Sequence, residues 1–483
     1  MKKFVAIVLS VVASTAIAQS NTKVLQKISR HTTAHSQAYI ALEEACRTIG
    51  HRLTGSPNGE KAEQYAYDFL KKSGLKNVRF QPFEVQSWSR GSVSLGIGTI
   101  NTDIFTELPT ATLAHSPAQA DVTAPIIDLG DGLAEEFQSA ADAVKGKIVL
   151  MNIGLTNRTE SRKNLHRSEK TALAIQHGAV GVIMINNAPG KILLTGTASV
   201  TGKTIPIPAV SITNDDGARL REELKKQPLA ARIQMTNQIG VIKARNVIGT
   251  IVGSDPAAGK IVIGGHLDSW DLATGASDNG IGSFAILDVA RTFAALKLKP
   301  KRTIEFVMFM GEEQGLLGSR QYVQQAIADS SIGQIALMIN VDMTSNPIGF
   351  SVPGQAQAET FYKAIGEKIR AIDNRFTNTF SSAAGLHSDH QPFMLQGVPV
   401  MSFVGSLPAK ALNCYHADCD NIDLVDAQAL KNTVRLMSMA LYELANAPTL
   451  PLQKMDDEAV KNFLIANGLK EPLVISGDWR WGK

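Results

Sequence analysis

The chain has 483 residues, of which 48 are lysine or arginine and 44 are aspartate or glutamate, so its formal net charge is only +4. This near balance excludes the strongly basic surface expected of a nucleic-acid-binding protein, and the length allows one to several domains. No segment beyond the N-terminus contains the run of about 18 apolar residues that a membrane-spanning helix needs, so we expect no membrane anchor.

Residues 1–18 have the three parts of a secretory signal peptide. Two lysines follow Met1, residues 4–13 are apolar, and Ala16, Ile17 and Ala18 form a cleavage site of the A-x-A type. We therefore predict cleavage after Ala18 and, from the bacterial form of the signal, a periplasmic or secreted protein. No cysteine follows the cleavage site, so a lipid anchor is not expected.

The elements that follow are predicted to be helical and then extended. Residues 37–74 show helical periodicity, interrupted by a turn-rich loop at 49–59. Residues 78–85 and 93–100 favour strands.

The pattern then changes to short strands. Strands are predicted at 121–130, 146–151, 179–185 and 205–211, with a helix over 168–178. In the second half, short apolar runs predict strands at residues 260–265, 302–310, 335–340 and 398–403, and the C-terminal part contains one predicted helix at 456–467.

Polar side chains follow three of these later strands directly. His266 ends the first run, Glu312 and Glu313 follow the second within GEEQG, and Asp342 follows the third. Ligands of open α/β sheets bind outside the carboxyl ends of the strands. We therefore expect these residues to meet at one edge of the sheet.

Five nitrogen and oxygen donors in this order could hold two cations, and such centres hydrolyse amides. The five are His266, Asp278, Glu313, Asp342 and His416. Asp268 lies two residues beyond His266 and could fix the orientation of its ring.

Each residue also has a structural explanation. His266 could be a core or capping residue, Asp278 a helix N-cap, and the Glu pair a response to the helix dipole. Together these explanations require five independent coincidences.

The motifs resemble those of the co-catalytic zinc exopeptidase family, which includes bacterial leucyl aminopeptidases, glutamate carboxypeptidase II and carboxypeptidase Q. The similarity rests on HLDSWD at 266–271, KRT at 301–303 and EEQG at 312–315, covers roughly residues 49–445, and is strongest to the carboxypeptidase Q branch. It implies an α/β fold with a mixed, mostly parallel central sheet flanked by helices.

The resemblance also implies roles for individual residues. His266 and Asp342 would bind one zinc ion, Glu313 and His416 would bind the second, and Asp278 would bridge both. Asp268 would orient His266, Glu312 would be the general base, and the Asp278–Asn279 peptide would be cis. Tyr415 would lie near the developing oxyanion, unless it only packs.

The phrases VKGKIVLMN, AIQHGAVGVIMIN and IPIPAVSI resemble a protease-associated (PA) domain. The predicted organisation is a signal peptide at 1–18, a peptidase domain at 19–108 and 240–448 interrupted by a PA domain at 109–239, and a tail at 449–483. The inserted domain either shapes or covers the substrate cleft, or serves dimerisation or stability.

Three further predictions concern the surroundings of the site. The segment around SDHQPF resembles one found in aminopeptidase members of the family, so His387 and Asp389 are expected in the substrate pocket, although a turn and helix start would also explain it. Arg320 is either a cationic anchor or a surface residue. Cys414 and Cys419 bracket His416 and could form a disulfide; the alternative is that all three cysteines, including Cys46, are reduced.

We expect an exported di-zinc metallo-exopeptidase that hydrolyses dipeptides or short peptides, with aminopeptidase or dipeptidase action favoured and a glutamate-carboxypeptidase-like enzyme as the alternative. A non-catalytic receptor-like homologue and a one-zinc acyltransferase of the glutaminyl cyclase type are the other readings. Two, no or one zinc ion per chain would separate the three classes. The expected partner is a peptide substrate, and the sequence leaves open whether two copies of the chain form a homodimer.

Overall fold

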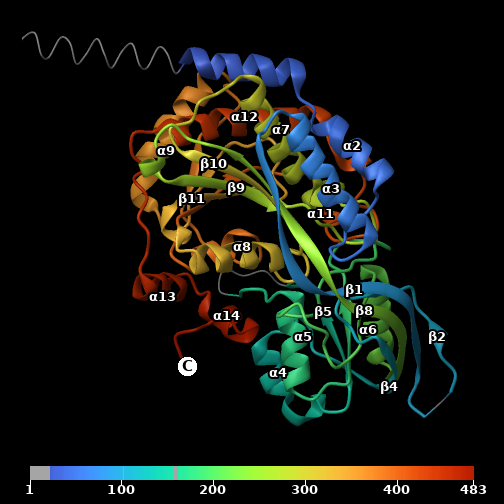
Figure 1. Cartoon of the computed structure of the whole chain (residues 1–483). Helices are drawn as coiled ribbons and strands as arrows, with labels where there is room; N and C mark the ends of the chain where they lie inside the picture. Colours follow the sequence, from blue (N-terminus) through green and yellow to red (C-terminus); the bar gives the residue numbers. More distant parts are fainter. Residues whose placement is uncertain (1–21, 102, 157–161, 483) are drawn as a thin grey trace, which may run out of the picture.

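The structure is a computed structural model that describes residues 22–101, 103–156 and 162–482. The predicted signal peptide lies outside the described residues. Figure 1 shows a larger body in which helices lie on both sides of a sheet, and a smaller body built from residues in the middle of the chain.

The larger body contains a mixed and mostly parallel sheet, as predicted. Its order is β13-β12-β14-β11-β9-β10-β8. The four central strands are mutually parallel where they pair: β9 (Lys260–His266), β10 (Thr303–Phe309), β11 (Ile335–Asn340) and β14 (Val400–Val404). The short strands β12 (Gly349–Ser351) and β13 (Thr379–Ser381) extend one side, with β12 antiparallel to β14.

Successive residues of the central strands face opposite layers of helices, because side chains alternate along a strand. Ile261 and Ile263 belong to one core cluster, and Val262 between them belongs to another. The first cluster is covered by α2 (Ala38–Thr48), α3 (Pro57–Lys72), α7 (Ile281–Ala295), α9 (Glu359–Arg370) and α12 (Ala427–Asn446). The second is covered by α8 (Leu317–Ala328), α10 (His390–Met394), α13 (Asp457–Ala466) and α14 (Lys470–Ser476).

A long two-stranded ribbon joins the two bodies. β1 (Asn77–Thr99) pairs antiparallel with β8 (Leu229–Ile251) along its whole length. One end of β8 pairs with β10 in the larger body, and the other end pairs with β4 in the smaller one. The prediction of two strands at 78–85 and 93–100 was therefore wrong: one strand continues through both, with a register shift between Arg90 and Val93.

The smaller body is a second sheet with its own core. Its strands β4 (Gln119–Asp128), β5 (Ile148–Asn152), β6 (Gly181–Ile185), β7 (Ala209–Ile212) and β3 (Ala111–Thr112) are neighbours in that order, and β2 (Thr106–Glu107) pairs with β1. The helices are α4 (Ala134–Ala140), α5 (Arg167–Gln176) and α6 (Asn214–Leu224). The predicted helix at 168–178 corresponds to α5. Separate apolar clusters lie on the two faces of this sheet.

The C-terminal segment forms two helices where one was predicted. The predicted helix at 456–467 corresponds to α13, and α14 was missed because it is short and contains Pro472. Leu473 of α14 is fully buried in the core of the larger body, and Ile475 packs against the core of the smaller one. α14 therefore lies where the two bodies meet (Figure 1). Among the described helices, none is both long and apolar enough to cross a bilayer.

Candidate metal centre

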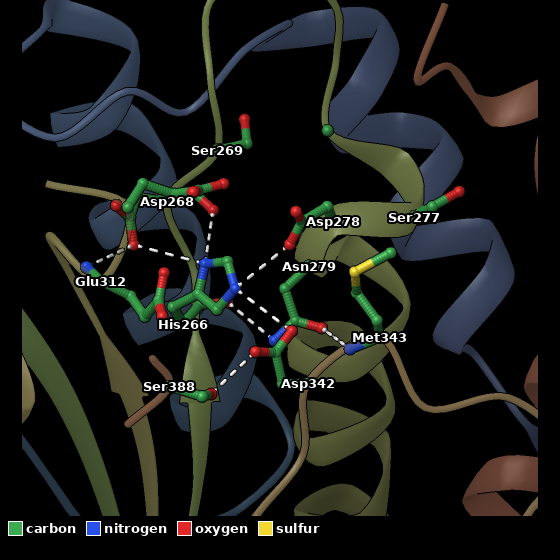
Figure 2. Close-up of polar contacts among 12 residues, drawn as sticks. His266, Asp268, Ser269, Ser277, Asp278, Asn279, Glu312, Asp342, Met343 and Ser388 are labelled. Carbon is green, nitrogen blue, oxygen red and sulfur yellow. Dashed lines mark hydrogen bonds and ion pairs between the residues drawn. The ribbon is translucent and has the colours of Figure 1, made fainter. Parts of the chain in front are cut away.

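The predicted donor residues meet at the carboxyl edge of the central strands. His266 is the last residue of β9, Glu313 follows β10, and Asp342 follows β11. Asp278 lies in a short helical turn, Ala276–Gly280, directly before α7. His416 comes from the loop after α11 (Ala409–Asn413). Figure 2 shows the side chains of His266, Asp278 and Asp342 pointing toward one another.

Asp278 lies between two imidazole rings. Its Oδ1 is 3.3 Å from Nε2 of His266, and its Oδ2 is 3.0 Å from Nε2 of His416. A second carboxylate approaches each ring: Oδ1 of Asp342 is 3.4 Å from Nε2 of His266, and Oε2 of Glu313 is 2.9 Å from Nε2 of His416. The site thus consists of two histidine–carboxylate pairs that share Asp278.

Backbone contacts fix the position of Asp278. The Asp278–Asn279 peptide is cis, which confirms that expectation. Asp420 accepts hydrogen bonds from the amides of Ser277 (2.8 Å) and Asp278 (2.9 Å). The Asn279 side chain donates to the Val341 carbonyl at 2.9 Å and accepts from the Met343 amide at 3.0 Å. These bonds tie the Asp278 turn to the loop that carries Asp342 (Figure 2).

The His266 ring and the Asp342 carboxylate also contact neighbouring groups that fix their positions. Nδ1 of His266 is 3.1 Å from the backbone oxygen of Asp268 and 3.6 Å from its Oδ1. The Glu312 amide donates to the same Oδ1 at 3.3 Å. Ser388 donates to Oδ2 of Asp342 at 2.7 Å. Asp268 therefore connects the His266 strand to the GEEQG loop.

The charges of the site suit a bound cation. Asp268 Oδ2, Glu313 Oε1 and Asp342 Oδ1 are buried and have no hydrogen-bond partner among the described residues. Burial raises the pKa of Glu312 and of Glu313 well above the usual range, and neighbouring carboxylates add to this. Burial opposes a charge on His266, but Glu312 and the adjacent aspartates hold its pKa well above the ordinary value. Buried carboxylates without donors are costly unless a cation accompanies them.

The set of donors also fits a metal ion chemically. Ligand atoms of His266, Asp278 and Glu313 all lie within 4.8 Å of one another. Imidazole nitrogen with carboxylate oxygen is a donor set typical of zinc. The residues present therefore fit such an ion.

A cavity lies beside the site and is lined by both bodies of the molecule. Glu312, Glu313, Tyr415 and His416 line one side, and residues 166–169 of the smaller body line another. Tyr415 stacks on His416, with ring centroids 3.8 Å apart.

Arg167, at the start of α5, is buried and donates to Nδ1 of His416, while its Nε has no partner among the described residues. A buried cation from the smaller body thus reaches the site.

The structure separates the two predicted pocket residues. His387 lines the cavity, stacks on His166 with ring centroids 4.8 Å apart, and places Nε2 3.4 Å from Oε1 of Glu169. Asp389 is fully buried and is not among the cavity-lining residues. Burial raises its pKa to about 7. The side chain of Asp389 is thus not exposed to the cavity.

Arg320 lines the cavity but is not a free cation. Its guanidinium donates to both carboxylate oxygens of Asp478, at 2.8 and 2.7 Å. A paired guanidinium is a weaker anchor for a substrate carboxylate, because its charge is already neutralised.

The loop that carries His416 is fastened at several points. Cys414 and Cys419 form a disulfide, and Cys46 is a buried free thiol. The amide of Thr195, from the smaller body, donates to the His416 carbonyl at 2.8 Å. The disulfide and the Thr195 hydrogen bond both restrict His416, the residue that pairs with Glu313.

Sequence reasoning missed several residues that shape the site. Arg52 is buried and donates to the carbonyls of Leu267, Thr274 and Gly275, so it holds the loop between His266 and Asp278. The only sequence signal for Arg52 was its place in the turn-rich loop at 49–59. Arg167 had no such signal, because its position depends on how the two bodies pack.

Comparison with known proteins agrees with this architecture. Residues 246–441 match the model of peptidase family M28, and residues 118–220 match the model of the PA domain. Carboxypeptidase Q of Xenopus laevis is 26% identical over 86% of this chain and 87% of its own length.

Two solved structures share the fold. The peptidase M28 precursor from Shewanella amazonensis SB2B has a TM-score of 0.76 and 23% identity, covering 91% of this chain and 99% of that chain. A zinc aminopeptidase from Bacillus subtilis has a TM-score of 0.63 and 23% identity, covering 87% of this chain and 98% of that chain.

Proposed function

We propose that this chain, which matches peptidase family M28 over residues 246–441 and the PA domain over residues 118–220, is an exported di-zinc exopeptidase acting on dipeptides or short peptides. The observation that carries the proposal is the position of Asp278 between His266 and His416, each of which has a further carboxylate beside it. This arrangement supports two adjacent metal ions that share one carboxylate.

The ligands follow from these contacts. His266 and Asp342 would hold one zinc ion, Glu313 and His416 the other, and Asp278 both. When bound, the two ions would polarise the peptide carbonyl and lower the pKa of a nearby water. Nε2 of His416 can bind an ion only when Nδ1 carries the proton, so Arg167 has to turn away from Nδ1 in that state.

The remaining chemistry belongs to side chains of this protein. Glu312 lines the cavity next to the proposed ligands, and its backbone amide is held by Asp268. We assign it the role of general base, which takes a proton from the attacking water and returns it to the leaving amine. The Tyr415 hydroxyl would donate a hydrogen bond to the developing oxyanion.

The cavity offers complementary charge to both ends of a dipeptide. Glu169 supplies an acidic group for a free amine, and the buried Arg167 supplies a cation for a free carboxylate. We favour aminopeptidase or dipeptidase action. Arg167 is the observation that favours the alternative, a carboxypeptidase.

Export follows from the predicted signal peptide, which would place the protein in the periplasm or outside the cell. The Cys414–Cys419 disulfide supports this, because such bonds persist in oxidising compartments.

The test of the proposed function is the Glu312→Gln variant. If Glu312 is the base, kcat for a dipeptide such as Leu-Ala should fall by at least about 10², while zinc content and melting temperature stay close to wild type. Elemental analysis should find two zinc ions per chain in both proteins.

Glu222→Gln is a suitable control, because the Glu222 side chain is 65% exposed and lies in the smaller body. Near wild-type activity of Glu312→Gln would refute the assignment, and loss of zinc would mean that Glu312 is a ligand.

A further inference from the structure

The C-terminal segment forms part of the wall of the catalytic cavity. Ser476 and Asp478 line the same cavity as Glu312 and His416. They lie at and just beyond the end of α14, which packs against α5 of the PA domain. Figure 1 shows α14 next to α4 and α5 and below α8. Residues far from the active-site motifs in sequence thus limit the space beside it.

This segment is anchored on both bodies of the molecule. Val460, Leu464 and Leu473 are buried in the core of the peptidase domain. Ile475 packs against the core of the PA domain, and Lys163 donates from Nζ to the Asn467 carbonyl at 2.9 Å. The wall is therefore a packed part of the fold.

Asp478 fastens the wall to the loops of the active site. It accepts both hydrogen bonds from Arg320, and Gln391 donates to its Oδ2 at 3.0 Å. Arg320 donates from Nε to the Gly315 carbonyl at 3.1 Å, within the loop that carries the Glu312–Glu313 pair. Gln391 accepts from the amide of His387 at 2.8 Å. Three partly or fully buried side chains thus form one connected clasp.

The neighbouring side of the cavity is also restricted. A second hollow lies between the PA domain and the C-terminal segment and shares Glu169, Leu386 and His387 with the first. The 3.4 Å contact between His387 and Glu169 lies on this shared boundary. A peptide that extended from one space into the other would have to pass this contact.

We propose that residues 476–478 set the length of peptide that the enzyme accepts, by closing the cavity with the Asp478–Arg320–Gln391 clasp. This inference rests on the proposed peptidase function. Each added residue lengthens an extended peptide by about 3.3–3.6 Å. A longer substrate would therefore have to displace Asp478 and break a bidentate, charge-assisted contact. A dipeptide leaves the clasp intact.

The experiment compares kcat/KM for Leu-Ala with kcat/KM for the pentapeptide Leu-Ala-Ala-Ala-Ala. The wild-type protein should prefer the dipeptide by about tenfold or more. Asp478→Ala and a chain that stops after Gly477 should each reduce this preference at least about fivefold, by raising kcat/KM for the pentapeptide. The truncation keeps Leu473 and the rest of α14.

Arg480→Ala is the matched control. Arg480 lies two residues from Asp478 and is ion-paired with Asp457, but it does not line the cavity. The Arg480→Ala variant should prefer the dipeptide over the pentapeptide to the same degree as the wild-type protein.

Zinc content and melting temperature identify variants that remain folded. Unchanged preference in folded, zinc-loaded Asp478→Ala, or equal cleavage of both peptides by wild type, overturns the inference while the peptidase function stands. Failure of the wild-type protein to cleave either peptide overturns the proposed function and this inference with it.

Discussion

Asp278 is the residue on which the proposed metal centre depends most. Its two carboxylate oxygens face different imidazoles, at 3.3 and 3.0 Å, whereas the other proposed ligands each approach only one side. Asp420 and Asn279 hold the turn around it through backbone contacts. Removal of Asp278 should therefore differ in kind from removal of any other proposed ligand.

We predict that Asp278→Ala loses both zinc ions or binds both weakly, whereas His416→Ala mainly loses one. The reason is that only Asp278 would contact both ions, and the loss of a ligand lowers the affinity of the site for each ion that the ligand contacts. Zinc per chain, measured after dialysis at fixed free zinc, distinguishes the two outcomes.

Asp423→Ala serves as the control, because Asp423 is an exposed partner of Lys410. Equal loss of zinc in Asp278→Ala and His416→Ala would contradict a shared ligand.

Among the elements, the loop between α11 and α12 is held by a covalent bond as well as by hydrogen bonds. The Cys414–Cys419 bond spans His416, which has a positive φ of 55°. Only a few residue types adopt this conformation readily, so the loop has to be held for His416 to keep its place.

Replacing both cysteines, as Cys414→Ser with Cys419→Ser, should lower the free energy of unfolding by about 2 kcal/mol and weaken the binding of one zinc ion. Denaturant unfolding and zinc titration measure the two effects.

Glu222→Ala changes an exposed side chain of the smaller body and leaves this loop unaltered, so its zinc affinity should match wild type. An unchanged zinc affinity in the double variant would show that the disulfide does not position His416.

A second inter-element contact lies away from the metal centre. Arg435 of α12 and Arg375 donate to Asp373, in the turn after α9, and the Asp373 side chain is only 6% exposed. Hydrogen bonds from Arg375 and Arg435 hold the pKa of Asp373 well below its ordinary value of 3.8. The stabilisation is thus complete above about pH 4 and is lost as the pH falls toward the lower pKa of the folded state.

Asp373→Asn should therefore lower the free energy of unfolding at pH 7 by about 3 kcal/mol, because Arg435 loses its buried counter-charge. The difference from wild type should shrink as the pH falls below about 4. Urea unfolding across this range measures it.

The exposed pair of Asp423 and Lys410 provides the comparison, and Asp423→Asn should change stability by at most about 1 kcal/mol. A pH-independent effect of Asp373→Asn would rule out the ionic explanation.

For the whole molecule, the cavity lies between the peptidase domain, the PA domain and the C-terminal segment. The peptidase domain supplies the proposed ligands, while the PA domain supplies Arg167 and Glu169. Because the cavity has both acidic and basic groups, its charges alone do not distinguish an aminopeptidase from a carboxypeptidase. Substrates with blocked end groups do.

We predict that a free α-amine is required. N-acetylation of Leu-Ala should lower kcat/KM by roughly 10² or more, because a site built for an ammonium group is left unfilled. A C-terminal amide should have a milder effect. Steady-state kinetics with the three peptides provides the measurement.

If the acetylated peptide is cleaved as fast as Leu-Ala and the amide is not, the enzyme is a carboxypeptidase. In that case Arg167 becomes the leading candidate for the anchor of the substrate carboxylate.

Local sequence patterns determined much of the peptidase fold. The apolar runs at 260–265, 302–310 and 335–340 correspond to β9, β10 and β11. Parallel strands end at a common edge of the sheet, so the positions of His266, Glu313 and Asp342 just after these strands predicted that they lie close together. The cis peptide at Asp278–Asn279 followed from family resemblance, which carries information that periodicity does not.

Only the tertiary structure decided what surrounds those residues. β1 is one strand because β8 pairs with it across the break near Arg90, and no local pattern contains that partner. His387 and Asp389 are two residues apart, yet one lines the cavity and the other is buried. Arg167 and Asp478 reach the cavity through packing between segments that are remote in sequence. Such contacts depend on how complete elements pack, which short-range propensities do not encode.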